Sequence, residues 1–202
     1  MIIAVAGLLA LLSPALTGGH LVRLSDLHLT SRRLILAAFL LQVLIIDVIP
    51  GANPTWLSAL HVLSYLLAGG FVLANRAIPG LGIASLGVAS NAITITINGG
   101  TLPASPLALR AAGITPPTTG FVNSGALAHP HLAWLGDIFD IPHPLPLANV
   151  FSIGDLIIVL GVGWGAHRIC GSRLVPSRPP RTNPPIETTT DTTVSSRTAS
   201  AG

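Results

Sequence analysis

The sequence has no lysine, one cysteine and few charged residues. Only 8% of its 202 residues are charged, against about 25% in soluble domains, which need a solvated surface. Cys170 is the single cysteine, which excludes an intrachain disulfide and a thiolate metal cluster. All ten basic residues are arginine. Nine of them are expected at one side of a membrane, which indicates the positive-inside pattern rather than a phosphate-binding patch for nucleic acid.

Apolar residues dominate the composition of the chain. The chain is 50% hydrophobic and its mean hydropathy is +0.72, so it is suited to lipid rather than to water. The predicted fold class is an all-α, polytopic transmembrane helix bundle of about five spans over residues 1–170. The expected spans are residues 1–17, 34–49, 55–75, 79–97 and 152–169.

Arginine placement predicts the orientation of this bundle. Arginines follow the first, third and fifth spans, whereas the loop between the second and third spans has none. Because cytoplasmic loops carry the excess of basic residues, the N-terminus is expected outside and the C-terminus in the cytoplasm of a bacterial plasma membrane. Asp47 is tolerated in the second span because the apolar residues around it outweigh the insertion cost of one carboxylate.

Two segments fall outside the spans. Residues 98–149 contain eight prolines and are predicted to form an irregular cap on the outer face, with a short interfacial helix over His131 to Ile141. Residues 171–202 have almost no apolar residue with which to form a core, which predicts a disordered cytoplasmic tail.

Polar residues recur at helical spacing inside two spans. Ser58, His61 and Tyr65 share one face of the third span, and a second polar face follows the fourth. Its members are Gly87, Asn91, Thr94 and Asn98. The two stripes predict either a polar cavity or hydrogen bonds between close-packed helices, and the second interpretation is favoured.

Candidate functional residues gather at the outer face. Besides Asn98, they are Gly99, Gly100, Pro103, Asp137, Asp140, Ser152 and Asp155. Clustered carboxylates beside lipid indicate tight pairing or use in function. A structural interpretation also exists: the Asn-Gly-Gly run is typical of a helix C-cap, and Ser152-x-x-Asp155 of a capping box.

Cofactor and metal motifs are not evident. His129, His131 and His143 accompany the carboxylates but lack the spacing of a metal site. The sequence contains no nucleotide-binding or serine-hydrolase motif. We therefore expect no cofactor and no metal.

The outer-face motifs carry a family resemblance. The runs Asn98-Gly99-Gly100-x-Leu102-Pro103, Leu135-Gly136-Asp137 and Phe151-Ser152-Ile153-Gly154-Asp155 resemble a polytopic bacterial membrane family, common in actinobacteria, catalogued as domain of unknown function five-three-one-seven. The resemblance covers about residues 1–170, with Leu102 where the family is expected to have Met. It implies a membrane location.

A second resemblance is fainter. The order Asn98-Gly99-Gly100, Gly136-Asp137-x-x-Asp140 and Phe151-Ser152-x-Gly154-Asp155 is similar to that in lipoprotein signal peptidase, an aspartyl intramembrane protease. The resemblance implies Asp140 and Asp155 as the catalytic pair. It departs from that family's pattern at Asp137, Ile141, Ser152 and Gly154.

Two functions remain open. One is a non-enzymatic membrane component that binds a lipid, a small ligand or a protein partner through its outer cap. The other is an aspartate-dependent hydrolase of a membrane-embedded substrate. The expected partners are the bilayer itself and anionic headgroups at Arg168, Arg173 and Arg178, with no nucleic acid.

Overall fold

The computed structural model describes residues 2–45, 54–115 and 123–175. Within this part the protein is mostly helical, with six α-helices and two small sheets. The helices are α1 (Ile2–Leu12), α2 (Arg32–Val43), α3 (Pro54–Ala74), α4 (Leu81–Ile97), α5 (Pro106–Ala111) and α6 (Ile153–Cys170).

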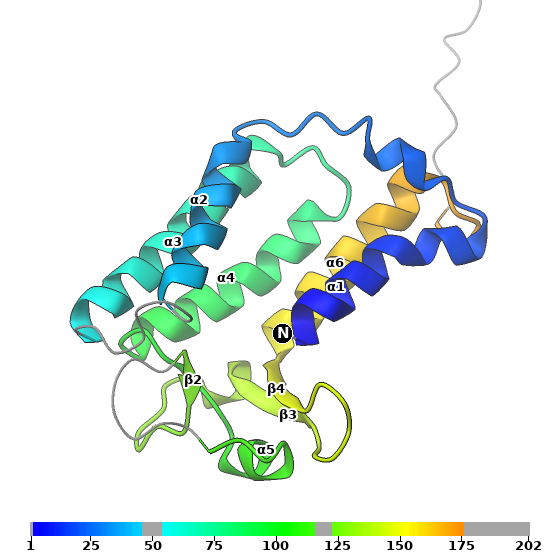
Figure 1. The fold of residues 1–202 in the computed structure, drawn as a ribbon. Coiled ribbons are helices and arrows are strands. Elements are labelled where there is room, and N and C mark those ends of the chain that lie inside the picture. Colours follow the sequence, from blue (N-terminus) through cyan, green and yellow to red (C-terminus); the bar gives the residue numbers. More distant parts are fainter. Residues whose placement is uncertain (1, 46–53, 116–122, 176–202) are drawn as a thin grey trace, which may run out of the picture.

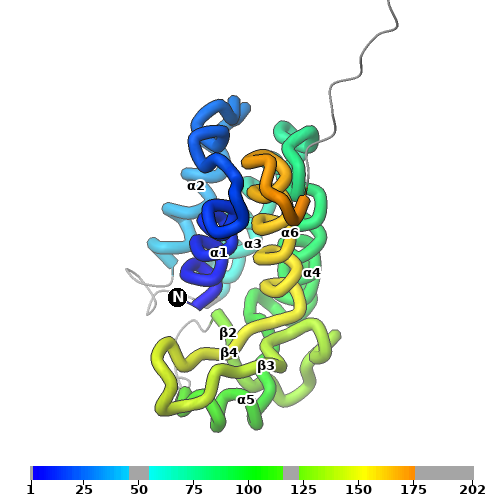
Figure 2. Tube along the Cα trace, turned by 90° about the vertical axis from the view of Figure 1, so that its right-hand side faces the viewer, coloured from blue at the N-terminus to red at the C-terminus, as the bar shows by residue number. Residues whose placement is uncertain are grey.

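The five longer helices pack side by side in the order α1, α6, α4, α3, α2. Neighbours along the chain alternate in direction, so that α1, α3 and α6 begin at the end where α2 and α4 finish (Figure 1). A loop with two short 3-10 helices, η1 (Ser13–Thr17) and η2 (Leu21–Leu24), lies at the opposite end. Figure 2 shows the remaining elements as a cap below the helices.

The cap contains strands, which corrects the all-α prediction. β1 (Leu102–Pro103) pairs in parallel with β2 (Ser124–Gly125), and β3 (Asp137–Ile141) pairs antiparallel with β4 (Asn149–Ser152). The predicted helix over His131 to Ile141 is wrong, because this segment holds only a 3-10 turn, η4 (Ala133–Leu135), before β3. Pairing with β4, including stacked rings of Phe139 and Phe151 at 5.5 Å, favours the extended backbone.

Two helices are long and apolar enough to cross a membrane, Thr55–Ala74 within α3 and Ile153–Cys170 in α6. Residues 2–17 and α4 are shorter apolar helices. Asp47 and the end of the predicted second span lie outside the described residues, as does the predicted tail beyond Val175.

Small residues let α4 and α6 approach closely. A Cβ added at Gly87 would overlap the carbonyl oxygen of Gly154, and one added at Gly161 would overlap the backbone of Ala84. Glycine is therefore required at these contacts, since any side chain would push the two backbones apart. The short distance between the backbones also lets Asn91, one helical turn after Gly87, reach the first turn of α6.

Candidate functional site

The first turn of α6 is fixed by a capping box. The Ser152 hydroxyl accepts a hydrogen bond from the Asp155 backbone N–H at 3.0 Å, and Asp155 Oδ2 accepts one from the Ser152 N–H at 2.9 Å. Two backbone donors that the helix itself leaves unpaired are thereby satisfied. The capping box expected from the sequence is confirmed.

Asn91 connects this cap to α4. Its Nδ2 donates to Asp155 Oδ1 at 3.0 Å, and its Oδ1 accepts from the Ser152 hydroxyl at 3.0 Å. Asn91 and Ser152 are both buried, at 4% and 0% exposure. Both carboxylate oxygens of Asp155 therefore accept a hydrogen bond, and its orientation is set by two elements.

Asp137 begins β3 and is only 5% exposed. The Ser124 hydroxyl donates to its Oδ2, whereas its Oδ1 is buried without a hydrogen-bond partner among the described residues. Burial raises the pKa of Asp137 to about 6; the hydrogen bond from Ser124 opposes this rise and the nearby charge of Asp155 adds to it. A buried oxygen without a partner costs stability unless a water or a ligand supplies a donor.

Asp137 and Asp155 line the same cavity, which has a volume of about 220 Å³. The cavity lies where α3, α4, the start of α6 and the cap strands meet. Its other polar lining residues are Tyr65, Asn91, Asn123, Ser124 and Asn149. No Arg or His is among the described lining residues. The arrangement can accept hydrogen bonds from a ligand and can balance a positive charge.

Asp140 lies elsewhere on the same strand. It pairs with Val150 in the β3–β4 ladder and is not among the described residues that line the cavity. The structure thus brings Asp137, rather than Asp140, together with Asp155.

The Asn-Gly-Gly run ends α4, as predicted, and fastens the cap. Gly99 and Gly100 have φ values of 68° and 101°, which favour glycine. Asn98 donates through Nδ2 to the His131 carbonyl at 2.9 Å and accepts through Oδ1 from the His131 N–H at 2.8 Å. The Gly100 carbonyl lies 3.1 Å from His61 Nδ1 on α3. Asn98, Gly99 and Gly100 thus position the cap on α3 and α4.

Pro103 has a positioning role as well. It lies in β1 beside Gly125 of β2, and its carbonyl packs so closely against Gly136 that a Cβ there would overlap it. Gly136 immediately precedes Asp137. Glycine at this position therefore lets β3 begin at the cavity.

Sequence reasoning identified part of the cavity. It placed Tyr65 and Asn91 on polar helical faces but did not connect them to the carboxylates. Ser124 and Asn149 were missed because nothing in their local sequence distinguishes them from ordinary loop residues.

Metal binding finds no support in the described residues, which contain no group of three or more His, Cys, Asp or Glu able to hold an ion. His143 donates its backbone N–H to the Ala111 carbonyl at 2.9 Å and is not among the described residues lining the cavity. His131 is held through its backbone by Asn98.

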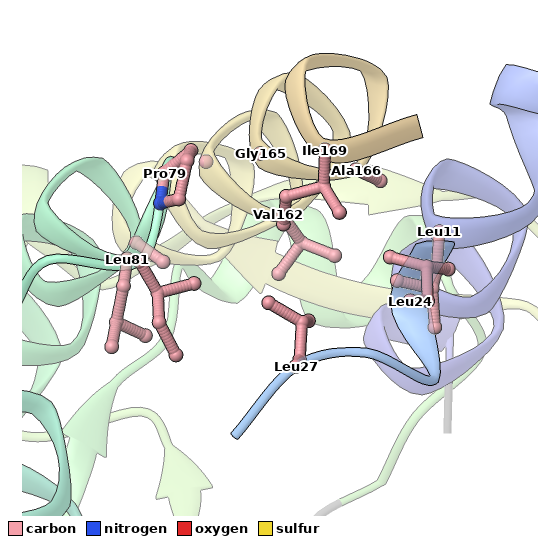
Figure 3. Close-up of a pocket in the computed structure, with 13 residues that line it drawn as sticks. Leu11, Leu24, Leu27, Pro79, Leu81, Val162, Gly165, Ala166 and Ile169 are labelled. Carbon is pink, nitrogen blue, oxygen red and sulfur yellow. The ribbon is translucent and has the colours of Figure 1, made fainter. Parts of the chain in front are cut away.

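A second cavity, of about 140 Å³, lies at the opposite end of the helices. Figure 3 shows apolar side chains surrounding it, among them Leu11, Leu24, Leu81 and Val162. Its described lining residues offer no polar side chain to orient a ligand, so the cavity lined by Asp137 and Asp155 is the stronger candidate site.

The comparison with known families bears on the same residues. A family model described as a family of unknown function (DUF5317) matches residues 26–165. The chain belongs to this family. The matched region extends from the loop before α2 into α6 and includes both carboxylates of the cavity, whereas α1 lies outside it. The DUF5317 resemblance of the outer-face motifs is thus confirmed.

No curated protein and no solved structure matches the chain.

Proposed function

We propose that this DUF5317 protein is a multi-pass protein of the bacterial plasma membrane with five spans, formed by α1 with η1, α2, α3, α4 and α6. The alternating directions of these helices support an odd number of crossings. The cap end, which carries Arg110, would be outside. The loop end would be cytoplasmic, because it carries Arg23, Arg32, Arg33, Arg76, Arg168 and Arg173.

Burial within the protein supports placing the helices in lipid. Only 22% of the span in α3 and 28% of that in α6 is buried, whereas the core helix of a soluble protein is mostly buried. Large apolar side chains face outward on each of the five helices, for example Leu9, Phe39, Leu66, Leu86 and Leu160. Apolar surface this extensive is rare on soluble monomers.

The function that the geometry supports best is non-enzymatic binding of a small polar ligand or lipid headgroup in the cavity lined by Asp137 and Asp155. We call it the outer cavity because it lies at the cap end, which would be outside. The observation that carries this proposal is Asp137, a buried carboxyl whose Oδ1 lacks a donor while it lines a cavity of about 220 Å³. A ligand N–H or O–H would supply that donor. Arg168 and Arg173 would meanwhile interact with anionic lipid headgroups at the cytoplasmic face, together with Arg178, which lies outside the described residues.

Native mass spectrometry of the full-length protein, purified in mild detergent, tests the binding function. We expect a non-covalently bound molecule in the wild type that is lost in Asp137→Asn. Asp140→Asn, which removes the same charge from the same strand, should retain it. Equal occupancy in all three proteins would place the bound molecule outside the cavity and contradict the proposal.

A hydrolase is the second candidate, since one cavity holds both a carboxyl with a raised pKa and a second carboxylate. Such a pair can divide the roles of general acid and general base. The pair would be Asp137 and Asp155, because Asp140 is not among the described residues lining the cavity. The double engagement of Asp155 by Asn91 and Ser152 favours a structural role for it instead.

Asp155→Asn tests the hydrolase. A general base cannot be replaced by an amide, so a hydrolase should lose its function while remaining folded. If this variant complements a deletion strain as well as the wild type does, the hydrolase is excluded.

A further inference from the structure

We propose that the outer cavity binds a primary ammonium group, held between Asp137 and Asp155, from either a free amine or an aminophospholipid headgroup. This inference rests on the proposed binding function and specifies its ligand class.

The charge of the cavity lining favours a bound cation. Two carboxyl groups, from β3 and α6, line one cavity, and the described lining residues include no arginine or histidine to balance them. The arginine of the cap, Arg110, is exposed on α5. Asp137 is buried, whereas Asp155 is half-buried. Burying an acidic group beside a second carboxylate without a counter-charge is unfavourable, and a bound cation between the two would compensate that cost.

Hydrogen-bond geometry selects among cations. Asp137 Oδ1 is buried without a donor, and a primary ammonium supplies three N–H donors from one compact charge. A quaternary ammonium has no N–H, and it is usually recognised by a cage of several aromatic rings. Tyr65 is the only aromatic side chain among the described residues that line the cavity.

A divalent metal fits less well. Ca²⁺ takes about six to eight oxygen ligands, and Mg²⁺ requires near-octahedral geometry. The amide oxygens of Asn91 and Asn149 already accept hydrogen bonds from the Ser152 hydroxyl and the Val150 N–H. The described residues also provide no group of three ionisable metal ligands.

The Tm of the full-length protein in detergent at pH 8, titrated with ethanolamine hydrochloride, tests this proposal. The Tm should rise saturably with ethanolamine but not with equal concentrations of tetramethylammonium chloride or MgCl₂. Loss of one charged acceptor should weaken apparent ethanolamine affinity roughly 10- to 100-fold in Asp137→Asn. Asp140→Asn should match the wild type.

Nanodiscs distinguish the two sources of the ammonium group. If the wild type retains more phosphatidylethanolamine than phosphatidylcholine from nanodiscs that contain both, and Asp137→Asn does not, the bound ammonium group belongs to a lipid headgroup. Equal retention of both lipids, with ethanolamine binding intact in pure phosphatidylcholine nanodiscs, indicates a free amine.

Three results would overturn the ammonium proposal: equal responses to ethanolamine and tetramethylammonium, a saturable response to Mg²⁺ alone, or equal loss of ethanolamine binding in both Asp variants. A non-amine molecule that co-purifies with the wild type and is lost in Asp137→Asn would also overturn it, yet would leave the binding function standing. If no molecule co-purifies and the Tm does not respond to ethanolamine, both the ammonium proposal and the proposed binding function are contradicted.

Discussion

Asn91 on α4 and Asp155 on α6 are joined by a hydrogen bond of 3.0 Å from Nδ2 to Oδ1. The bond links the middle of the helical layer to the capping box that begins α6. It also holds the Asp155 carboxylate at the cavity that Asp137 lines from the cap. Helix packing and the geometry of the candidate site therefore depend on the same side chains.

Two substitutions of Asp155 should distinguish the stability contributed by its hydrogen bond in the capping box from that contributed by its hydrogen bond to Asn91. We expect Asp155→Ala to lower the free energy of unfolding by about 1–3 kcal/mol, since it removes the acceptor of the Ser152 N–H, one of the two bonds of the capping box, and leaves the Asn91 donor without its acceptor. Asp155→Asn should recover much of this loss, because an amide oxygen still accepts the Ser152 N–H. The Tm of both variants in detergent measures the difference, and a Tm for Asp155→Ala equal to that of the wild type would contradict the structural role.

Asp137 should make stability depend on pH in an identifiable direction. Its pKa is about 6 in the folded protein against an ordinary 3.8, so the folded state binds the proton more tightly than the unfolded state. This contribution is fully present below about pH 4 and is lost as pH rises through 6, by at most about 3 kcal/mol.

In protein freed of bound ligand, Asp137→Asn should therefore raise the Tm at pH 8 and leave it nearly unchanged at pH 4. Four other ionisable groups lie on the elements around Asp137. Asp155 and Tyr65 line the same cavity, Asp140 lies on β3, and Arg110 lies on α5. Asp140→Asn serves as the matched control and should not change the pH dependence of the Tm. A lower Tm for Asp137→Asn at pH 8 would show that the carboxylate is stabilising in the empty protein.

Close packing of α4 on α6 predicts opposite effects of two glycine substitutions in one helix. Gly87→Ala should lower stability by about 1–3 kcal/mol, because its Cβ overlaps the backbone of Gly154. Gly82 has no atom within 4 Å of an added Cβ. Because it lies in the first turn of α4, Gly82→Ala should raise stability by less than the ~1 kcal/mol of a helix interior. Thermal unfolding of the two variants in the same detergent checks both signs.

Topology is open to a direct test with enzyme fusions. Alkaline phosphatase fused after Gly113, in the cap, should be active because the enzyme requires an oxidising compartment outside the cytoplasm to form its disulfides. A fusion after Arg173 should be inactive. Activity at Arg173 would contradict the five-span arrangement and the orientation derived from the arginines.

The limits of the helical segments could be predicted from the sequence because they follow from local composition. Apolar runs bounded by Pro, Gly and Arg predicted helices near α3, α4 and α6 within a few residues, and Ser152-x-x-Asp155 predicted the capping box. Both depend on neighbours within one or two helical turns. The family resemblance likewise followed from short runs of adjacent residues.

The strands of the cap depended on tertiary structure. β1 pairs with β2 across about twenty residues, and β3 needs β4 to satisfy its backbone. Neither partner is evident from the Pro-rich sequence between Asn98 and Asn149, which led to the wrong expectation of an irregular cap with one short helix.

The sequence by itself determined that carboxylates gather at one end of the helices, because acidic residues fall just before and within the start of α6. Only the tertiary structure decided which of them line the same cavity. Asp137 and Asp140 are three apart on β3, and a register shift against β4 lies between Asp137 and Phe139, so regular alternation of side chains along a strand does not decide where each one lies. Pairing with β4 and the close approach of Gly136 to Pro103 place Asp137 in the cavity with Asp155, a result of long-range packing that local sequence does not encode.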